Sequence, residues 1–146
     1  MSGPDRMPHD LDRFISAQQG VYDGALAELR RGRKTGHWIW FILPQLAGLG
    51  RSDISRQYAI ASMDEAKAYL AHPVLGPRLR SCAQALLDLP EYATAVGVFG
   101  SLDAMKARSS MTLFHRADPD DPAFRAVLER YFAGEADPLT DDLLGT

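Results

Sequence analysis

The chain has 146 residues, 46% of them hydrophobic and 24% charged, which is long enough for one globular domain with a buried core. Its net charge of −3 argues against sequence-independent binding to duplex nucleic acid, which requires a basic surface. The single cysteine, Cys82, excludes an internal disulfide and a zinc site built from several cysteines, and it fits a small buried apolar residue.

Residues 1–9 contain two prolines and no apolar run, so we expect a flexible N-terminal tail rather than a signal peptide. A single helical domain is expected over residues 10–146. The longest apolar run, residues 38–43, is much shorter than the ~20 residues that span a bilayer. These features predict a cytoplasmic protein without membrane contact.

Two helices are predicted before Gly32, the first beginning at Asp10 and the second ending in Arg30 and Arg31. The cations at positions 30, 31, 33 and 34 complement the dipole at the end of the second helix. The same cations also make a local basic patch that could contact a ligand. The helix-termination reading is favoured, because cations are common at helix ends.

The next stretch, residues 36–46, contains both tryptophans and His37, and Pro44 lies near its end. A short helix is predicted from about residue 36 to residue 43, with Thr35 as its cap. Six consecutive apolar residues also fit a short buried strand. We favour the helix, because no other segment of the chain offers a convincing strand partner.

The rest of the chain is also predicted to be helical, from start signals and apolar spacing. These signals are Ser52, the capping box of residues 62–65, the apolar pattern of residues 74–89, the short apolar segment 92–99, Ser101, Asp121-Pro122 and Asp137-Pro138. The fold class is therefore all-α, a single compact domain of seven to eight short helices.

Several polar side chains lie within apolar segments, where an unpaired buried polar group would cost about 1–3 kcal/mol. They either satisfy one another or line a cavity for a polar ligand. Tryptophan faces beside cations and hydroxyls suit a flat anionic ligand such as a nucleotide, and His37 is a candidate proton shuttle. The candidate ligand-binding residues are Arg13, Gln18, Lys34, His37, Trp38, Trp40, Lys106, Arg108, Ser109 and Ser110.

No cofactor or metal site is expected. The four histidines lie in different segments, none at the spacing that places two ligands on one helix face, and no phosphate-binding glycine loop is present.

Specific motifs carry a family resemblance over nearly the whole chain. They are Arg13-Phe14-x-x-Ala17-Gln18, His37-Trp38-Ile39-Trp40-Phe41-Ile42-Leu43-Pro44-Gln45-Leu46, His72-Pro73-Val74-Leu75-Gly76 and Lys106-x-Arg108-Ser109-Ser110-Met111-Thr112-Leu113-Phe114. The chain resembles the family named domain of unknown function 1810, which implies a mainly α-helical domain without an established activity. Some members are labelled calpastatin, but calpain-inhibitor repeats are disordered and Pro-rich, whereas this sequence is rich in core residues.

A weaker resemblance concerns the segments 14–18, 105–114 and Gly134-Glu135-Ala136-Asp137. They are similar to elements of the NADAR family, all-α N-glycosidases that act on ADP-ribose-type substrates. The family's glutamate falls near Asp12, and its neighbouring histidine is replaced by Arg13. The resemblance implies Asp12 as the catalytic carboxylate, which would stabilise a ribosyl oxocarbenium centre or activate water.

Two functions therefore stay open at the level of sequence. One is a domain that binds a nucleotide or an ADP-ribose-type molecule in a Trp/His/Lys-lined pocket, with or without N-glycosidase activity. The alternative is a non-enzymatic protein-interaction domain whose tryptophans lie in the core. Convergence of the indoles and Lys106 on an open cleft would favour the first.

Overall fold

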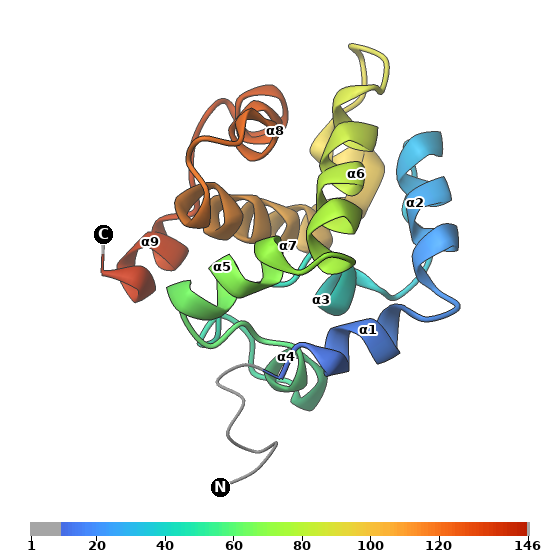
Figure 1. Cartoon of the computed structure of the whole chain (residues 1–146). Coiled ribbons are helices and arrows are strands. Elements are labelled where there is room, and N and C mark those ends of the chain that lie inside the picture. Colours follow the sequence, from blue (N-terminus) through green and yellow to red (C-terminus); the bar gives the residue numbers. More distant parts are fainter. Residues whose placement is uncertain (1–9, 146) are drawn as a thin grey trace, which may run out of the picture.

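Nine helices occupy residues 10–145, the part of the chain that the computed structural model describes (Figure 1). They are α1 (Asp12–Gln18), α2 (Tyr22–Arg31), α3 (Ile39–Ile42), α4 (Asp53–Gln57), α5 (Met63–Ala71), α6 (Leu75–Leu87), α7 (Ala95–Ala117), α8 (Pro122–Phe132) and α9 (Pro138–Leu144). The all-α fold class is confirmed, and the described residues form nine helices rather than seven to eight. The predicted tail, residues 1–9, lies outside the described residues.

The tryptophan-rich stretch forms a helix rather than a strand, as predicted, but the helix covers only residues 39–42. Trp38 precedes it without a side-chain cap, so Thr35 does not begin the helix. The loop after it makes one isolated parallel β-bridge between Leu46 and Ile60, which ties residues 43–50 to the segment after α4. Short pieces of this kind are held by tertiary packing, because four residues are too few for a stable isolated helix.

The longest helix, α7, runs through the middle of the molecule (Figure 1). Helices α5, α8, α9 and α3 all pack against it, while α6 packs against α2, α5 and α8. Gly100 interrupts α7 with φ +78° and ψ 166°, a conformation that glycine adopts readily. The sequence predicted separate helical segments on either side of this glycine, and the kink confirms that division.

Four fully buried aromatic rings connect helices that are distant in sequence. Phe14 of α1 meets Tyr69 of α5 edge-on, with ring centroids 5.2 Å apart. Tyr69 lies 5.3 Å from Phe114 of α7, and Phe114 lies 6.0 Å from Phe124 of α8. Cys82 is also fully buried, and this burial raises the pKa of its thiol to about 12, which fits the apolar role predicted for it.

The C-terminal end of α6 is closed by a side chain from α8. Arg130 donates hydrogen bonds of 2.6–3.1 Å to the carbonyl oxygens of residues 86, 87, 89 and 90. The hydroxyl of Tyr131 donates to the carbonyl of Leu86 at 2.5 Å. Carbonyl groups at a helix end lack intrahelical donors, so this arginine supplies them and joins α8 to α6.

None of the helices described here combines the length and the apolar character that crossing a lipid bilayer requires.

Candidate ligand-binding site

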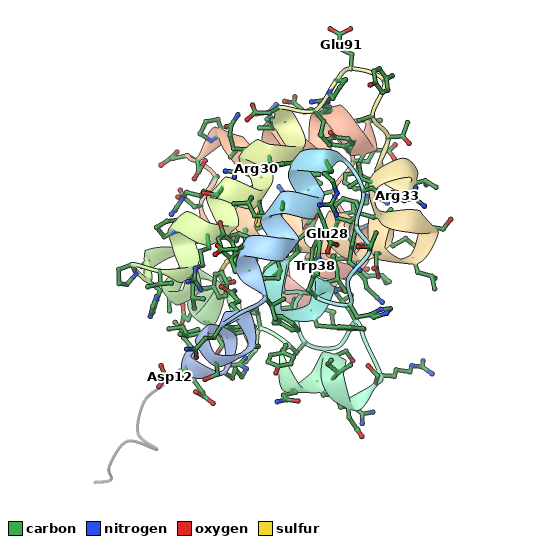
Figure 2. The ribbon with its side chains drawn as sticks, turned by 90° about the vertical axis from the view of Figure 1, so that its right-hand side faces the viewer. Asp12, Glu28, Arg30, Arg33, Trp38 and Glu91 are labelled. Atoms are coloured by element: carbon green, nitrogen blue, oxygen red, sulfur yellow. The ribbon has the colours of Figure 1, made fainter. Side chains whose placement is uncertain are left out.

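Glu28 of α2 organises the loop that leads into the tryptophan-rich stretch (Figure 2). Its Oε1 accepts hydrogen bonds from the backbone N–H of Thr35 at 2.7 Å and of Gly36 at 2.9 Å. The same oxygen accepts from the indole Nε1 of Trp38 at 3.0 Å. Burial acts to raise the pKa of Glu28, but the hydrogen bonds outweigh it and lower the pKa to about 2.

Trp38 is therefore a core residue whose one polar atom is already bonded. Its side chain is 2% exposed, and the Lys34 ammonium lies 5.0 Å from its ring centroid. That ammonium also donates to the carbonyl of Gly36 at 2.5 Å and pairs with Asp103 at 2.6 Å. The Lys34 side chain is only 6% exposed, so both residues belong to the interior.

Trp40 and Lys106 repeat this pairing at the surface. The Lys106 ammonium lies 5.1 Å from the ring centroid of the half-buried Trp40. Asp103 stands between the two pairs, 2.6 Å from Lys34 and 3.4 Å from Lys106. Because Lys34 makes the shorter ion pair, Asp103 neutralises the charge of Lys106 only in part.

A pocket of about 250 Å³ opens next to this surface pair, between the loop after α3 and the helices α7 and α9. We call it the α7–α9 pocket. Its lining residues are Trp40, Gln45, Leu49, Gly50, Ser55, Leu102, Met105, Lys106, Arg108, Ser109, Asp137 and Leu139.

A second cavity of about 160 Å³ adjoins the first. The two share Trp40, Gln45, Gly50 and Ser55, so these residues form a partition between them. Arg56 and Tyr58 line its far side.

Two polar wall residues, Arg108 and Ser109, are held by contacts within the fold. Arg108 donates from Nε to the carbonyl of Glu135 at 2.8 Å and from Nη2 to the carbonyl of Ala136 at 2.9 Å. The Ser109 hydroxyl donates to Asp137 Oδ2 at 2.8 Å, and the Met105 carbonyl, 3.1 Å away, is the alternative acceptor for its single hydrogen. Carbonyl oxygens orient the guanidinium without cancelling its charge, so the wall stays cationic.

Four of the ten predicted ligand-binding residues line the α7–α9 pocket: Trp40, Lys106, Arg108 and Ser109. The other six do not belong to its lining.

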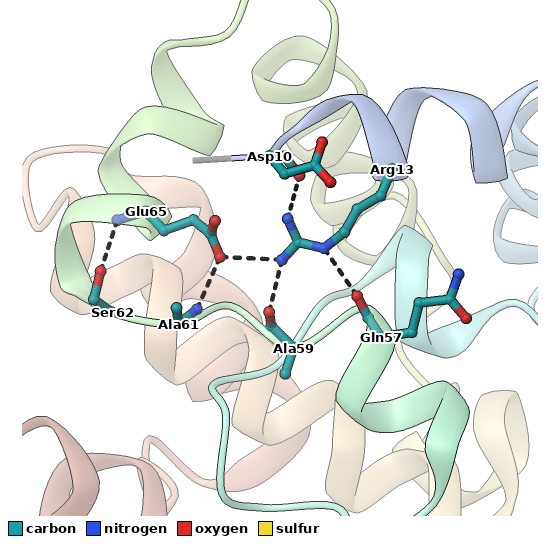
Figure 3. Close-up of polar contacts among 7 residues, drawn as sticks. All are labelled: Asp10, Arg13, Gln57, Ala59, Ala61, Ser62 and Glu65. Atoms are coloured by element: carbon teal, nitrogen blue, oxygen red, sulfur yellow. Dashed lines mark hydrogen bonds and ion pairs between the residues drawn. The ribbon is translucent and has the colours of Figure 1, made fainter. Parts of the chain in front are cut away.

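Arg13 instead fastens α1 to the segment between α4 and α5 (Figure 3). It donates to the carbonyl oxygens of Asp10, Gln57 at 2.9 Å and Ala59 at 2.7 Å, and to Glu65 Oε1 at 3.1 Å. Glu65 belongs to the predicted capping box, which the structure confirms: its backbone N–H donates to the Ser62 hydroxyl at 3.2 Å. Its carboxylate accepts from the Ala61 N–H at 2.8 Å. These contacts account for the polar groups of Arg13 within the fold.

Gln18 is likewise satisfied in the interior. Its Nε2 donates to the Phe41 carbonyl at 2.8 Å and to the Tyr69 hydroxyl at 3.1 Å, and its Oε1 accepts from Arg78 at 3.2 Å. The residue is 2% exposed. It joins α1 to α3, α5 and α6.

The two residues predicted to be catalytic lie apart from the pocket. Asp12 is exposed on α1, and its side chain points away from the body of the domain (Figure 2). His37 is exposed in the loop before α3 and is not among the lining residues. Ser110 is fully buried, and its hydroxyl has no hydrogen-bond partner among the described residues.

Sequence reasoning missed more than half of the pocket lining. Gln45 follows α3, Ser55 lies in the short helix α4, and Asp137 precedes α9. In the sequence, each of these residues is already accounted for as part of a helix end, so nothing marks it as a pocket residue. Leu102, Met105 and Leu139 fit the apolar faces of helices, yet they are 75%, 68% and 62% exposed. Within residues 10–145, no group of three or more histidine, cysteine, aspartate or glutamate side chains is placed to hold a metal ion.

Residues 8–144 match the model of the family described as "Protein of unknown function (DUF1810)", and the chain belongs to this family. The fold is similar to that of the conserved hypothetical protein Rv1873 from Mycobacterium tuberculosis, a crystal structure, with 45% sequence identity and a TM-score of 0.92. The similarity covers 95% of this chain and 99% of that one. No curated protein shows significant similarity to the chain.

Proposed function

We propose that the α7–α9 pocket binds a small anionic ligand with a flat ring system, of the nucleotide or ADP-ribose type. The observation that carries the proposal is the Lys106 ammonium, 5.1 Å from the Trp40 ring centroid at the wall of an open pocket. An indole face stacks on a heterocycle, and an ammonium beside it attracts a phosphate.

The charge of the wall supports an anion. Lys106 and Arg108 contribute two cations to the lining, and Asp137 contributes one carboxylate. The Glu135 carboxylate also lies near this wall, with its Oε2 3.8 Å from Nη2 of Arg108. The Glu135 side chain is 75% exposed, so water weakens this ion pair. The formal charge of the lining is therefore +1, in a protein whose net charge is −3.

The size and the apolar lining support a ring system. A volume of about 250 Å³ lies just below the usual range for small-molecule sites, about 300–1,000 Å³. Leu49, Leu102 and Met105 supply apolar surface around the polar groups. Most ligand sites combine such a lining with a few polar side chains.

The proposal concerns binding. Hydrolysis of an N-glycosidic bond would need a carboxylate at the ribosyl centre. Asp12, the residue predicted for that role, does not line the pocket, and neither does His37.

A thermal-unfolding screen against AMP, ADP, NAD and ADP-ribose tests the proposal. A ligand at a hundred times its Kd stabilises the folded state by about 2.7 kcal/mol, which shifts the Tm of a domain this size by roughly 5–10 °C. Titration calorimetry then compares the wild type with Trp40→Leu and Lys106→Met. We expect each variant to weaken binding at least tenfold, because each removes one of the two central contacts.

Lys67→Met is the matched control, since Lys67 is exposed on α5 and does not line the pocket. It should bind as the wild type does. The proposal fails if no nucleotide changes the Tm, or if Trp40→Leu and Lys106→Met bind as tightly as the control.

A second candidate, a protein-interaction domain, is favoured by one specific observation. Leu102, Met105 and Leu139 are largely exposed at the rim of the pocket, and large exposed apolar side chains in a group mark contact surfaces. This alternative expected both tryptophans in the core; Trp38 lies there, whereas Trp40 is half-buried at the pocket wall. If this candidate is right, the double substitution Leu102→Ser with Met105→Ser should abolish binding of a protein partner. If the pocket instead binds a nucleotide, Lys106→Met should weaken nucleotide binding.

A further inference from the structure

Asp137 lines the α7–α9 pocket, and one of its two carboxylate oxygens is not used by the fold. Its Oδ2 accepts the hydroxyl of Ser109 at 2.8 Å and the hydroxyl of Thr140 at 2.6 Å. Its backbone N–H donates to Thr112 Oγ1 at 2.9 Å. Oδ1, by contrast, has no hydrogen-bond partner among residues 10–145.

The other Asp-Pro helix start shows that this arrangement is not required for capping. Asp121 precedes Pro122 as Asp137 precedes Pro138, and Asp121 Oδ1 accepts the backbone N–H of Ala123 at 3.0 Å. The side chain of Asp137 makes no such hydrogen bond to the backbone of α9. Instead, two hydroxyl donors fix one oxygen, and the side chain lies in the wall of the pocket.

A carboxylate in the wall of an anion-binding pocket constrains the ligand. An ionised carboxylate only accepts hydrogen bonds, and it repels a phosphate that approaches it. A bound ligand must therefore place a hydrogen-bond donor at Asp137 and its negative charge at Lys106 and Arg108. A ligand ammonium would be drawn to Asp137 but repelled by these two cations, so a neutral hydroxyl fits both requirements.

We infer that Asp137 accepts a hydrogen bond from a sugar hydroxyl of the ligand, so that the pocket selects ribonucleotides over their deoxy analogues. This inference rests on the proposed function and names the class of ligand within it. Carboxylates recognise ribose hydroxyls in this way in dinucleotide-binding folds of unrelated architecture. Here the acceptor is held by Ser109 of α7 and Thr140 of α9, the two helices that flank the pocket.

The test compares the Kd of AMP with those of 2′-deoxy-AMP and 3′-deoxy-AMP by titration calorimetry. We expect at least one deoxy analogue to bind about tenfold more weakly to the wild type, because it leaves the half-buried carboxylate without its donor. In Asp137→Asn the ratio of the Kd of that deoxy analogue to the Kd of AMP should fall below about threefold. Asparagine can keep its single oxygen as the acceptor for Ser109 and Thr140, but an amide NH2, which only donates, then replaces Oδ1, so both the charge and the acceptor for the ligand hydroxyl are lost.

Asp121→Asn is the matched control, because it makes the same change at the same position of an Asp-Pro helix start outside the pocket. It should keep the wild-type ratio. The inference is overturned if the wild type binds both deoxy analogues within twofold of AMP, or if Asp137→Asn preserves the discrimination. The comparison of ligands on the wild type holds even if the variant does not fold. Failure of AMP to bind at all would instead overturn the proposed function.

Discussion

Replacing Glu28 by glutamine should destabilise the domain in a manner that depends on pH. Glu28 accepts three hydrogen bonds through one oxygen, and its pKa is lowered from its ordinary 4.5 to about 2. By linkage this difference corresponds to roughly 3 kcal/mol. The carboxylate is partly exposed, so screening by water reduces our expectation to about 2 kcal/mol at pH 7.

The sign follows from the direction of the pKa change. Because the folded-state pKa lies below the unfolded value, the contribution of Glu28 is fully present above pH 4.5 and is lost as the pH falls toward 2. Glu28→Gln lacks this titration. The difference in unfolding free energy between wild type and variant should therefore be largest at pH 7 and fall to less than half by about pH 3.

Urea unfolding followed by tryptophan fluorescence at pH 7, 4.5 and 3 measures this difference. Glu91→Gln is the control, because Glu91 is exposed in the loop after α6 (Figure 2). It should change stability by less than about 0.5 kcal/mol at every pH. A Glu28→Gln difference below 0.5 kcal/mol at pH 7, or one that stays constant to pH 3, would refute the reasoning.

Two further substitutions test how the helices are joined. Arg130→Ala leaves four carbonyl groups at the end of α6 and just after it without their donor, so the unfolding free energy measured in urea titrations should fall by about 2–3 kcal/mol. Arg31→Ala is the control, because Arg31 is exposed, and it should change the unfolding free energy by less than about 0.5 kcal/mol. Gly76→Ala places its Cβ against the carbonyl oxygen of Leu70, so α5 and α6 must move apart and the Tm should fall by at least 5 °C. Gly24→Ala has open space and should hold or raise the Tm; equal effects of the two glycine substitutions would contradict this account of the α5–α6 contact.

The sequence by itself determined the fold class and most helix starts, because these depend on neighbours within one or two turns. The Ser62 capping box and the Asp121-Pro122 start are local hydrogen-bond geometries, and both appear as predicted. The break at Gly100 follows from the conformational freedom of a single residue. The length of α3 was overestimated chiefly at its start, because residues 35, 36 and 38 donate hydrogen bonds to Glu28 in a loop before the helix.

Only the tertiary structure decided which polar residues serve the fold and which face the pocket. Trp38 and Trp40 are two residues apart and therefore point to different sides of the chain, one bonded to Glu28 and the other exposed to the pocket. Arg13, Gln18 and Lys34 each have partners that lie 23 to 69 residues away in sequence, which no local pattern reveals. Asp137, a helix-start residue in the sequence, joins the pocket wall because α9 packs on α7 and brings its first turn beside Ser109. A helical period specifies which residues share a face, whereas the neighbour that covers that face is set by the packing of the whole domain.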